Sequence, residues 1–376
     1  ELLTGYSGRN DVAFALYADL NNNGRIDDTD QLIDTLSDSD RNGIVVFDYH
    51  LDSIFPGITN PSDYPTRYLV LETVAPDGFY VNSNPVSVIV SASSDYSGSV
   101  SVSNRPYITL SFEIDKYDAW SSLLLNSYPG DRAATFDLYI DTYQDGLLDD
   151  SDVLLDTLED TDRDGIIRAS YVLDSDFITQ YLNGADPFDY PTHYLVVETA
   201  APFNYYRSDA VFSVIVDACQ YHPSATVAVE EIPYTAQLRV YKYDSDTSRE
   251  ISNAVFTVFN DVDGNRSYTD GVDTVAQTCV NGQLSDAQIV WNMQEGCYVS
   301  SQLRPGGYVV VETGLPEGYF YVDANGVPTL NANELYFDIA GADTSLAGFV
   351  PAQYEGTVYN SSPQIHTTLT NNITHS

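Results

Sequence analysis

Tyr64-Pro-Thr-Arg-Tyr-Leu-Val-Leu-Glu-Thr73 returns further along the chain as Tyr190-Pro-Thr-His-Tyr-Leu-Val-Val-Glu-Thr199. A more divergent third copy ends in Gly307-Tyr-Val-Val-Val-Glu-Thr313. A second stretch, Phe14-Ala-Leu-Tyr-Ala-Asp19, recurs in the same order as Phe136-Asp-Leu-Tyr-Ile-Asp141. Repetition at this spacing predicts three structural repeats of about 120 residues each.

Within each repeat, short β-branched and aromatic runs are separated by clusters of Gly, Pro, Asn and Asp. Val86-Ser-Val-Ile-Val90 and Leu238-Arg-Val-Tyr241 are typical of strands. No long helical periodicity is visible, although a short helical turn is expected at Ser175–Tyr181. We predict an all-β protein of three tandem immunoglobulin-like β-sandwich domains and a C-terminal tail. The predicted boundaries are residues 1–105, 106–232, 233–362 and 363–376.

The composition excludes several classes of function. The 376 residues include 55 acidic and 15 basic side chains, for a formal net charge of −40. A nucleic-acid-binding protein needs a basic face, and an anionic membrane surface repels such a chain. No apolar stretch approaches the roughly 20 residues of a membrane span. The five histidines are not at metal-ligand spacing and no catalytic motif is present, so we predict that the protein is not an enzyme.

Three further features recur in the repeats. The first is a Glu-Thr-x-x-Pro box, which begins at Glu72, Glu198 and Glu312. The second is the strand Val-Tyr-Lys-Tyr-Asp at residues 240–244, and the third is a closing Val-x-Asn that ends at Asn104 and Asn360. Together they resemble the prealbumin-like B-type repeats of collagen adhesins and related Gram-positive pilin domains, over nearly the whole chain. The resemblance implies prealbumin-like sandwiches at a cell surface.

The chain has only two lysines, Lys116 and Lys242, and they occupy the same place in the second and third repeats. Side chains alternate along a strand, so Lys116 shares a face with Phe112 and Ile114. An ammonium group among apolar neighbours is costly unless it is paired. Both lysines are therefore expected to face the core and to have a partner there.

In the family that this sequence resembles, the inward lysine condenses with an Asn of the last strand, assisted by the Glu of the box, to form an isopeptide bond. The third repeat has all three residues: Lys242, Glu312 and Asn360. Two interpretations stay open there, a covalent cross-link and a buried Lys–Glu pair with the Asn hydrogen-bonded nearby.

The second repeat departs from that pattern. It contains Lys116 and Glu198, but Glu231 stands where the Asn is expected. These residues are weaker candidates for a cross-link, and a salt bridge of Lys116 is the expected arrangement.

The first repeat has Glu72 and Asn104 but no lysine strand, since only a short polar segment precedes Phe14. At the other end, the tail has the pattern of a first strand with no domain behind it. One face of this candidate donor strand carries Ile365, Thr367, Leu369, Asn371 and Ile373. We predict a head-to-tail homopolymer in which the tail of one subunit completes the first repeat of the next. The alternatives are a frayed tail and a groove filled by residues 1–13.

Asp-rich loops follow the strands that begin at Phe14, Phe136 and Phe256. From Asp19 to Asp30, oxygen-bearing side chains stand at loop positions 1, 3, 5, 9 and 12, with Gly at position 6, as in a calcium loop. The first repeat offers the candidate ligands Asp19, Asn21, Asn23, Asp27, Asp30, Asp38, Asp40 and Asn42. The second offers Asp141, Asp145, Asp149, Asp152, Asp160, Asp162 and Asp164. The third offers Asp261, Asp263 and Asn265, with Asp270 or Asp273 as the last ligand. We predict bound Ca²⁺; the alternative is a solvated acidic turn.

Cysteines and glycosylation sequons provide the remaining candidate sites. Cys279 and Cys297 flank one segment of the third repeat, and a disulfide between them fits a secreted protein. Cys219 is left over, either as a buried thiol or as an intermolecular bridge. Sequons occur at Asn265, Asn360 and Asn372, and Asn360 cannot be both cross-linked and glycosylated.

Two functional hypotheses follow. The first is a secreted structural subunit of an extracellular, cell-surface fibre or pilus, which polymerises with itself and is stabilised by Ca²⁺. The second is a monomeric adhesin stalk, a binding module whose Tyr-rich face holds a glycan or another surface ligand. The first predicts polymers of the purified protein, and the second predicts monomers.

Overall fold

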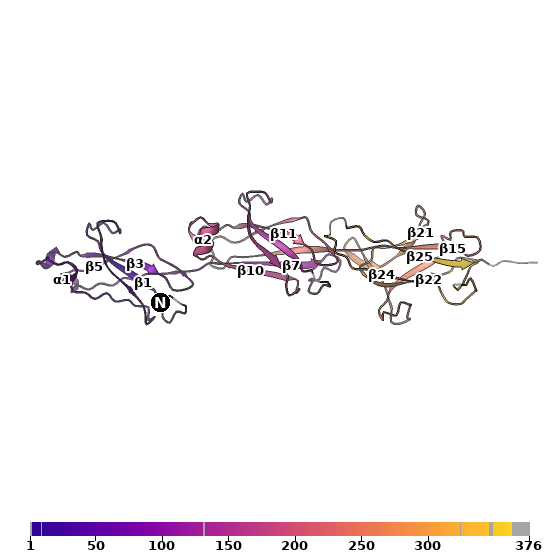
Figure 1. Ribbon diagram of the computed structural model, residues 1–376, viewed down its shortest axis with the longest axis horizontal. Helices are drawn as coiled ribbons and strands as arrows, with labels where there is room; N and C mark the ends of the chain where they lie inside the picture. Colours follow the sequence, from indigo (N-terminus) through magenta and orange to yellow (C-terminus); the bar gives the residue numbers. More distant parts are fainter. Residues whose placement is uncertain (1, 9, 131, 324, 346–348, 363–376) are drawn as a thin grey trace, which may run out of the picture. The chain divides into compact units, whose positions relative to one another are not determined.

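The computed structural model describes residues 2–8, 10–130, 132–323, 325–345 and 349–362, and Figure 1 shows their course. Strands make up 41% of the chain and helices 6%, which confirms the predicted all-β class. None of the helices in these ranges has the length and apolar character needed to cross a bilayer. The chain divides into two compact units, residues 1–111, 170–190 and 217–224, and residues 112–169, 191–216 and 225–376. The three-domain boundaries stay a prediction, and the repeats are named by them below.

The first repeat contains one four-stranded antiparallel sheet. Its elements are β1 (Ala13–Ala18), β2 (Gln31–Ser37), α1 (Leu51–Ile54), the 3₁₀ turn η1 (Pro61–Asp63), β3 (Arg67–Val74), β4 (Phe79–Tyr80), β5 (Val86–Ile89), the 3₁₀ turn η2 (Ala92–Ser94) and β6 (Arg105–Pro106). The strand order is β2-β1-β3-β5, and the short β4 pairs with β6 outside this sheet.

The second repeat has two four-stranded sheets, ordered β10-β7-β14-β12 and β13-β11-β8-β9. Its elements are β7 (Thr109–Asp118), β8 (Thr135–Ile140), β9 (Val153–Glu159), β10 (Ile166–Val172), α2 (Ser175–Tyr181), η3 (Pro187–Asp189), β11 (His193–Ala200), β12 (Tyr205–Tyr206), β13 (Val211–Ile215) and β14 (Ser224–Pro233). Helix α2 coincides with the expected helical turn. It begins after Asp174, whose carboxylate accepts backbone N–H bonds from the first turn.

The third repeat has a five-stranded sheet, β20-β21-β15-β25-β23, a four-stranded sheet, β17-β16-β22-β24, and the hairpin β18-β19. Its strands are β15 (Leu238–Asp244), β16 (Val255–Asn260), β17 (Thr274–Val275), β18 (Gln277–Val280), β19 (Gln283–Asp286), β20 (Ile289–Asn292), β21 (Cys297–Ser300), β22 (Gly306–Gly314), β23 (Phe320–Tyr321), β24 (Glu334–Ile339) and β25 (Tyr354–Ser361). The first strand, β15, and the last, β25, are parallel neighbours (Figure 1).

Strands β7 and β15 bury every second residue. The buried residues of β7 are Leu110, Phe112, Ile114, Lys116 and Asp118. Those of β15 are Leu238, Val240, Lys242 and Asp244. Side chains alternate between the two faces of a strand, so the alternation that points the apolar side chains into the core also points both lysines into it.

Candidate functional site

The third repeat brings three candidate residues together inside its core. Lys242 on β15, Glu312 on β22 and Asn360 on β25 are completely buried. Lys242 Nζ donates a hydrogen bond to Glu312 Oε2 at 2.9 Å, and Asn360 Nδ2 donates to Glu312 Oε1 at 2.8 Å. The parallel register places Lys242 opposite Val358, two residues before Asn360. One carboxylate therefore holds the amine and the amide on its two oxygens.

Asn333, which the sequence analysis did not identify, completes this group. Its Nδ2 donates to Glu312 Oε2 at 2.7 Å and to Asn360 Oδ1 at 2.8 Å. A donor at Oδ1 stabilises negative charge that develops on the amide oxygen. Asn333 lies between β23 and β24, outside every repeated motif, so the repeat pattern carried no signal for it.

The surroundings of Lys242 favour a neutral amine. Burial lowers the pKa of Lys242, and the nearby Glu312 carboxylate opposes this shift. A neutral amine is a nucleophile, the amide carbon of Asn360 is an electrophile, and Glu312 touches both as a proton acceptor. The arrangement is suited to forming an amide bond with release of ammonia.

The second repeat surrounds its lysine with different partners. Lys116 forms a salt bridge with Asp160, and both side chains are completely buried. Tyr128 Oη donates to Asp160 Oδ2 at 3.0 Å, and the Lys116 ammonium lies 5.1 Å from the centre of the Tyr128 ring. The sequence analysis placed Asp160 among the calcium ligands and Glu198 and Glu231 beside the lysine. The structure instead pairs Asp160 with Lys116, because Asp160 follows directly on β9 and its side chain enters the core.

Glu198 and Glu231 form a buried acidic pair in the same core. Burial raises the pKa of Glu198. Burial, and next the charge of Glu198, raises the pKa of Glu231 to about 9. Glu231 therefore keeps its proton at neutral pH. The second repeat thus has a protonated acid at the place where the third has the Asn360 amide.

The first repeat has the acid and the amide without a lysine. Asn104 Nδ2 donates to both carboxylate oxygens of Glu72, each at 2.7 Å. The backbone N–H of Asn82 donates to Glu72 Oε2 at 2.6 Å, and Glu72 is buried. The Glu72–Asn104 contact therefore reproduces the Glu312–Asn360 contact of the third repeat.

Residues 2–8 and 10–12 do not take the place of a lysine strand. Tyr6 makes the contacts that Tyr128 makes in the second repeat. In both cases the hydroxyl accepts the backbone N–H six residues later and donates to an aspartate 32 residues later. Residues 2–12 therefore correspond to residues 124–134, which follow β7 in the chain. Of residues 2–8 and 10–12, none is in a strand.

Both edges of that strand position are unpaired in the first repeat. In the second repeat β7 lies between β10 and β14. The corresponding residues of the first repeat, 44–50 and 100–104, are not in strands, and Val46 is 70% exposed. Phe14 is only partly buried, whereas its counterpart Phe136 is completely buried. No described residue of the first repeat therefore occupies the position of β7.

The Asp-rich loops share one local geometry. The first aspartate of the loop, Asp19 or Asp141, accepts backbone N–H bonds from the residues four and five positions later. The last aspartate also accepts two backbone N–H bonds; it is Asp30, Asp152 or Asp273. Gly24 has a φ of 75° at the sixth position, where a residue with a Cβ is strained. Asp273 thus takes the final position that the sequence left open between it and Asp270.

The remaining candidate ligands lie in these loops or in the loops that follow β2 and β9. Most are exposed: Asn21, Asn23, Asp27, Asp40, Asn42, Asp145, Asp149, Asp162, Asp263 and Asn265. Hydrogen bonds from Thr29, then Asn21 and Asn23, lower the pKa of Asp27. Asp38 is buried and, like Asp19, accepts two backbone N–H bonds within its own loop.

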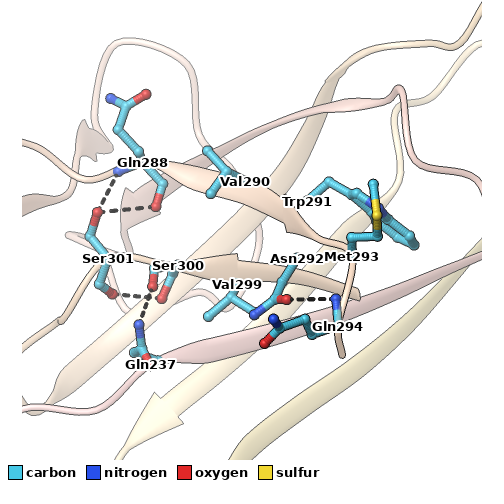
Figure 2. Close-up of a pocket in the computed structure, with 10 residues that line it drawn as sticks. All are labelled: Gln237, Gln288, Val290, Trp291, Asn292, Met293, Gln294, Val299, Ser300 and Ser301. Atoms are coloured by element: carbon cyan, nitrogen blue, oxygen red, sulfur yellow. Dashed lines mark hydrogen bonds between the residues drawn. The ribbon is translucent and has the colours of Figure 1, made fainter. Parts of the chain in front are cut away.

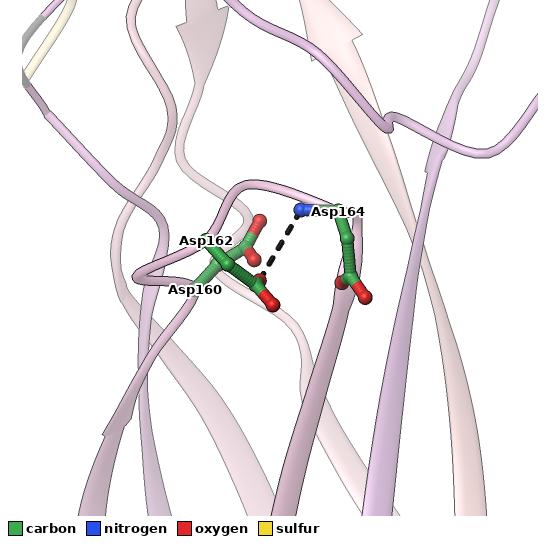
Figure 3. A group of neighbouring side chains, drawn as sticks. All are labelled: Asp160, Asp162 and Asp164. Atoms are coloured by element: carbon green, nitrogen blue, oxygen red, sulfur yellow. Dashed lines mark hydrogen bonds between the residues drawn. The ribbon is translucent and has the colours of Figure 1, made fainter.

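Within the described ranges, two groups of aspartates bring their carboxylate oxygens within 4.8 Å of one another: Asp160, Asp162 and Asp164, and Asp261, Asp263 and Asp273. Figure 3 shows the first group, in which the Asp164 N–H donates to Asp162 Oδ1 at 3.4 Å. Its Asp160 is already paired with Lys116. Each group contains one buried oxygen with no hydrogen-bond partner in the described part of the chain, Asp160 Oδ1 in the first and Asp261 Oδ1 in the second, but the aspartates of the second group are not paired with a lysine. The second group is therefore the better candidate metal site.

The predicted disulfide is not formed. Cys279 and Cys297 are free thiols, because Cys279 lies in the β18-β19 hairpin and Cys297 lies in the five-stranded sheet. Cys219 is exposed. The sequon residue Asn265 is exposed, whereas Asn360 is completely buried. The sequon at Asn372 and all the donor-strand residues lie outside the described residues.

A shallow pocket lies beside β20, the edge strand of the five-stranded sheet (Figure 2). Its lining includes Val290, Trp291 and Met293, together with Gln, Asn and Ser side chains. None of the lining residues is charged, so the pocket lining has no carboxylate, imidazole or amine for acid–base chemistry.

Comparison with known proteins identifies the fold. Residues 236–335 match the family profile of SpaA, the prealbumin-like fold domain. Comparison with curated proteins gives no match. Among solved structures, the chain is similar to the Bacillus anthracis TIE protein, with 16% identity and a TM-score of 0.40 over 94% of this chain and 48% of that one. It is also similar to the shaft pilin SpaA from Lactobacillus rhamnosus GG, with 17% identity and a TM-score of 0.24 over 69% and 100%.

This chain spans less than half the length of the TIE protein. The family match lies within the third repeat, and it agrees with the motifs that resemble pilins and adhesins. The protein therefore has the prealbumin-like β fold that its sequence predicts.

Proposed function

We propose that this chain is a structural subunit of an extracellular fibre or pilus, and that its subunits join head to tail by strand donation. The observation that supports this is the strand position in the first repeat that no described residue occupies. Residues 44–50 and 100–104 border it without strand partners, and unpaired edges bind added strands. An added strand also covers the partly exposed Phe14 and removes apolar surface from water.

The proposed donor is the segment 363–376, which is separated from the end of β25 by Ser362. Its sequence places Ile365, Leu369 and Ile373 on one face of an extended strand. Each subunit then offers one donor and one acceptor on different surfaces. Such a contact is heterologous, and its repetition builds an open filament. The segment has no lysine, so this joint is not covalent.

The test is assembly of the full chain. Wild type is expected to form filaments that are visible by negative-stain electron microscopy and by light scattering. The triple substitution Ile365→Asp, Leu369→Asp and Ile373→Asp places charges on the apolar face, so it is expected to leave monomers.

The matched control carries the same three charges on the opposite face, through Thr368→Asp, Thr370→Asp and Asn372→Asp. It is expected to assemble. Filaments formed by the apolar-face variant contradict strand donation. A wild-type chain that remains monomeric at every concentration supports the adhesin stalk instead.

In the third repeat we propose an intramolecular isopeptide bond between Lys242 and Asn360. A bond forms between Lys242 Nζ and Asn360 Cγ while the Cγ–Nδ2 bond breaks. Glu312 accepts a proton from the amine and passes it to the departing ammonia, and Asn333 holds the amide oxygen. The intact mass is then lower than that of the sequence by one ammonia. An intact mass equal to that of the sequence would show that no isopeptide bond forms and that Lys242 and Glu312 remain a buried ion pair.

We further propose that the Asp-rich loops bind Ca²⁺. Asp261, Asp263 and Asp273 hold three carboxylates close together, and one buried oxygen of Asp261 has no hydrogen-bond partner among the described residues. Like charges at this separation repel unless a cation or a proton joins them. Carboxylate and amide oxygens are the ligands that Ca²⁺ prefers. In the first repeat, Asp19 and Asp30 would hold the ion, which would also reduce the repulsion within a chain of net charge −40.

A chelator tests this proposal. Removal of Ca²⁺ is expected to lower the Tm, and added Ca²⁺ is expected to restore it. Asp19→Asn should weaken Ca²⁺ binding to the first repeat in calorimetry. Asp28→Asn, an exposed neighbour outside the ligand set, should not. A Tm that the chelator does not change would contradict the proposal that the loops bind Ca²⁺.

A further inference from the structure

We propose that the second and third repeats are locked into one rigid body, because Arg304 of the third repeat is held in a socket of the second. Both repeats contribute to one compact unit, which comprises residues 112–169, 191–216 and 225–376. The lock fixes the angle between the two repeats at their joint. The inference concerns a contact within one chain and is independent of the strand donation proposed above.

The socket is built around Asp118, the last residue of β7, which is buried. Asp118 Oδ1 accepts backbone N–H bonds from Trp120 and Ser121, each at 2.9 Å. Asp118 Oδ2 accepts a hydrogen bond from the Tyr205 hydroxyl at 2.8 Å. These bonds are all made within the second repeat and hold the carboxylate in one orientation. A buried carboxylate in a fixed orientation is a binding site for a cation.

Arg304 supplies that cation. Its Nη2 donates to Asp118 Oδ1 at 2.6 Å, and its guanidinium carbon lies 4.8 Å from the centre of the Trp120 ring. Both contacts cross from one repeat to the other, and a carboxylate beside an aromatic ring suits the flat guanidinium group. Burial raises the pKa of Asp118, but the hydrogen bond from Arg304 is the largest of the effects that bring it below its ordinary value. Asp118 is therefore ionised at neutral pH.

Arg304 is not part of the repeated pattern. It stands eight residues before the Glu of its Glu-Thr-x-x-Pro box, and the first and second repeats have Tyr64 and Tyr190 at that place. The hydroxyls of these two tyrosines donate to backbone oxygens within their own repeats. An arginine at this position is therefore not needed to build a repeat, whereas its side chain makes the joint.

A second contact is made by residues 341–345, which lie between β24 and β25 of the third repeat. The backbone N–H of Asn204 donates to Ala342 O at 3.0 Å, and Asn204 Oδ1 accepts the Ala342 N–H at 2.8 Å. The Thr344 hydroxyl donates to Tyr205 O at 2.6 Å. Since Tyr205 also belongs to the socket, the two contacts share a residue and support each other.

The fit around this segment is close. A Cβ added at Gly341 would lie 2.5 Å from Cε1 of the Phe203 ring and 2.6 Å from Asn204 Oδ1, both in the second repeat. Arg132 Nη1 also donates to Asp343 Oδ1 at 2.7 Å, which adds a second ion pair across the joint. A rotation of one repeat against the other would therefore break these polar contacts or press the segment against the Phe203 ring.

Double electron–electron resonance between two spin labels tests whether the joint is rigid. Labels are attached to Glu159→Cys in the second repeat and to Thr357→Cys in the third, two exposed strand positions. The full chain is used, with the substitutions Cys219→Ser, Cys279→Ser and Cys297→Ser. Dilution with unlabelled protein ensures that only distances within one chain are measured. A single narrow distance distribution is expected.

Two variants open the joint in different ways. Arg304→Gln with Arg132→Gln removes both ion pairs and the cation–π contact, so it is expected to broaden the distribution by about a factor of two. Gly341→Ala keeps every charge but places a methyl group against Phe203, and it is expected to shift the mean distance. The control is Arg249→Gln, at an exposed arginine of the same repeat outside the joint, which should leave the distribution unchanged.

A broad distribution for the labelled parent chain overturns the rigid body. In a folded double variant, a narrow distribution at the parent distance overturns the role of Arg304. Circular dichroism shows whether each variant is folded. If the double variant does not fold, Gly341→Ala carries the test, and an unchanged distribution in that variant overturns the close joint.

Discussion

The third and second repeats place a buried lysine at the same point of the same strand but give it opposite partners. Lys242 contacts one carboxylate that also accepts a hydrogen bond from an amide, whereas Lys116 lies in a core with three acidic side chains. Strand periodicity decides that the amine is buried, and the residues on neighbouring strands and loops decide what it can do. In the third repeat, the Asn360 amide allows condensation with the lysine. In the second repeat, Asp160 forms an ion pair with Lys116, and Glu231 keeps its proton.

The largest effect is expected for Glu312→Ala in the third repeat. It removes the acid that accepts hydrogen bonds from the buried Lys242 and Asn360, and also the group that transfers the proton. Each buried polar group left without a hydrogen-bond partner costs about 1–3 kcal/mol of unfolding free energy, and both Lys242 and Asn360 lose theirs. Urea unfolding measures this loss, and mass spectrometry should show that the ammonia is retained.

The matched control for that variant is Glu317→Ala, an exposed acid of the same repeat, which should change the unfolding free energy by less than about 0.5 kcal/mol. A Glu312→Ala protein with wild-type stability and wild-type mass would contradict the assignment of the site.

Asp160→Ala in the second repeat should cost less, about 1.5–3 kcal/mol, the range for a hydrogen bond to a charged group. The loss is smaller because Glu198 and Glu231 remain and one of them ionises to balance Lys116. Asp162→Ala, in the exposed part of the same loop, is the control. A loss equal to that of Glu312→Ala would show that the acidic pair does not compensate.

The pH dependence sharpens the comparison further. The pKa of Glu231 rises from 4.5 to about 9 on folding, so the folded state keeps a proton that the unfolded state releases between these values. Its stabilising contribution is therefore complete below the lower value and is lost as the pH rises toward the upper one. Glu231→Gln cannot titrate, so its Tm should fall less over this range than that of wild type.

Glu230→Gln, at the exposed neighbouring position, is expected to follow the wild-type profile. Identical profiles for wild type and Glu231→Gln would show that Glu231 ionises normally.

The smallest effect is expected at the surface of the third repeat. Arg239 and Glu295 form an ion pair of 2.8 Å whose side chains are partly exposed to solvent. Such pairs contribute at most about 1 kcal/mol and are screened by salt. Glu295→Ala should therefore change the unfolding free energy slightly at low salt and not measurably at high salt. A loss comparable to that of Glu312→Ala would mean that burial is not what distinguishes the two pairs.

The sequence alone predicted the β fold and the inward lysines, which follow from strand alternation and from motifs that recur at fixed spacing. The grouping of Lys242 with Glu312 and Asn360 was what the resemblance to pilin and adhesin repeats implied. The pairing of Lys116 with Asp160 and the role of Asn333 were not predicted, because both depend on the paths of loops, which periodicity does not describe. The expected disulfide was wrong because nearness along the chain does not place two cysteines in one sheet.

The parallel register of β15 and β25 has a mechanical consequence. Both ends of the third repeat leave through these two strands, and the paired residues run from Leu238 to Asp244 along one and from Tyr354 to Asn360 along the other. Tension applied at the two ends would load this ladder in shear, so that its hydrogen bonds resist together instead of opening one by one. A bond between Lys242 and Asn360 would carry the load directly from one strand to the other, and the rest of the repeat would be shielded from the pull.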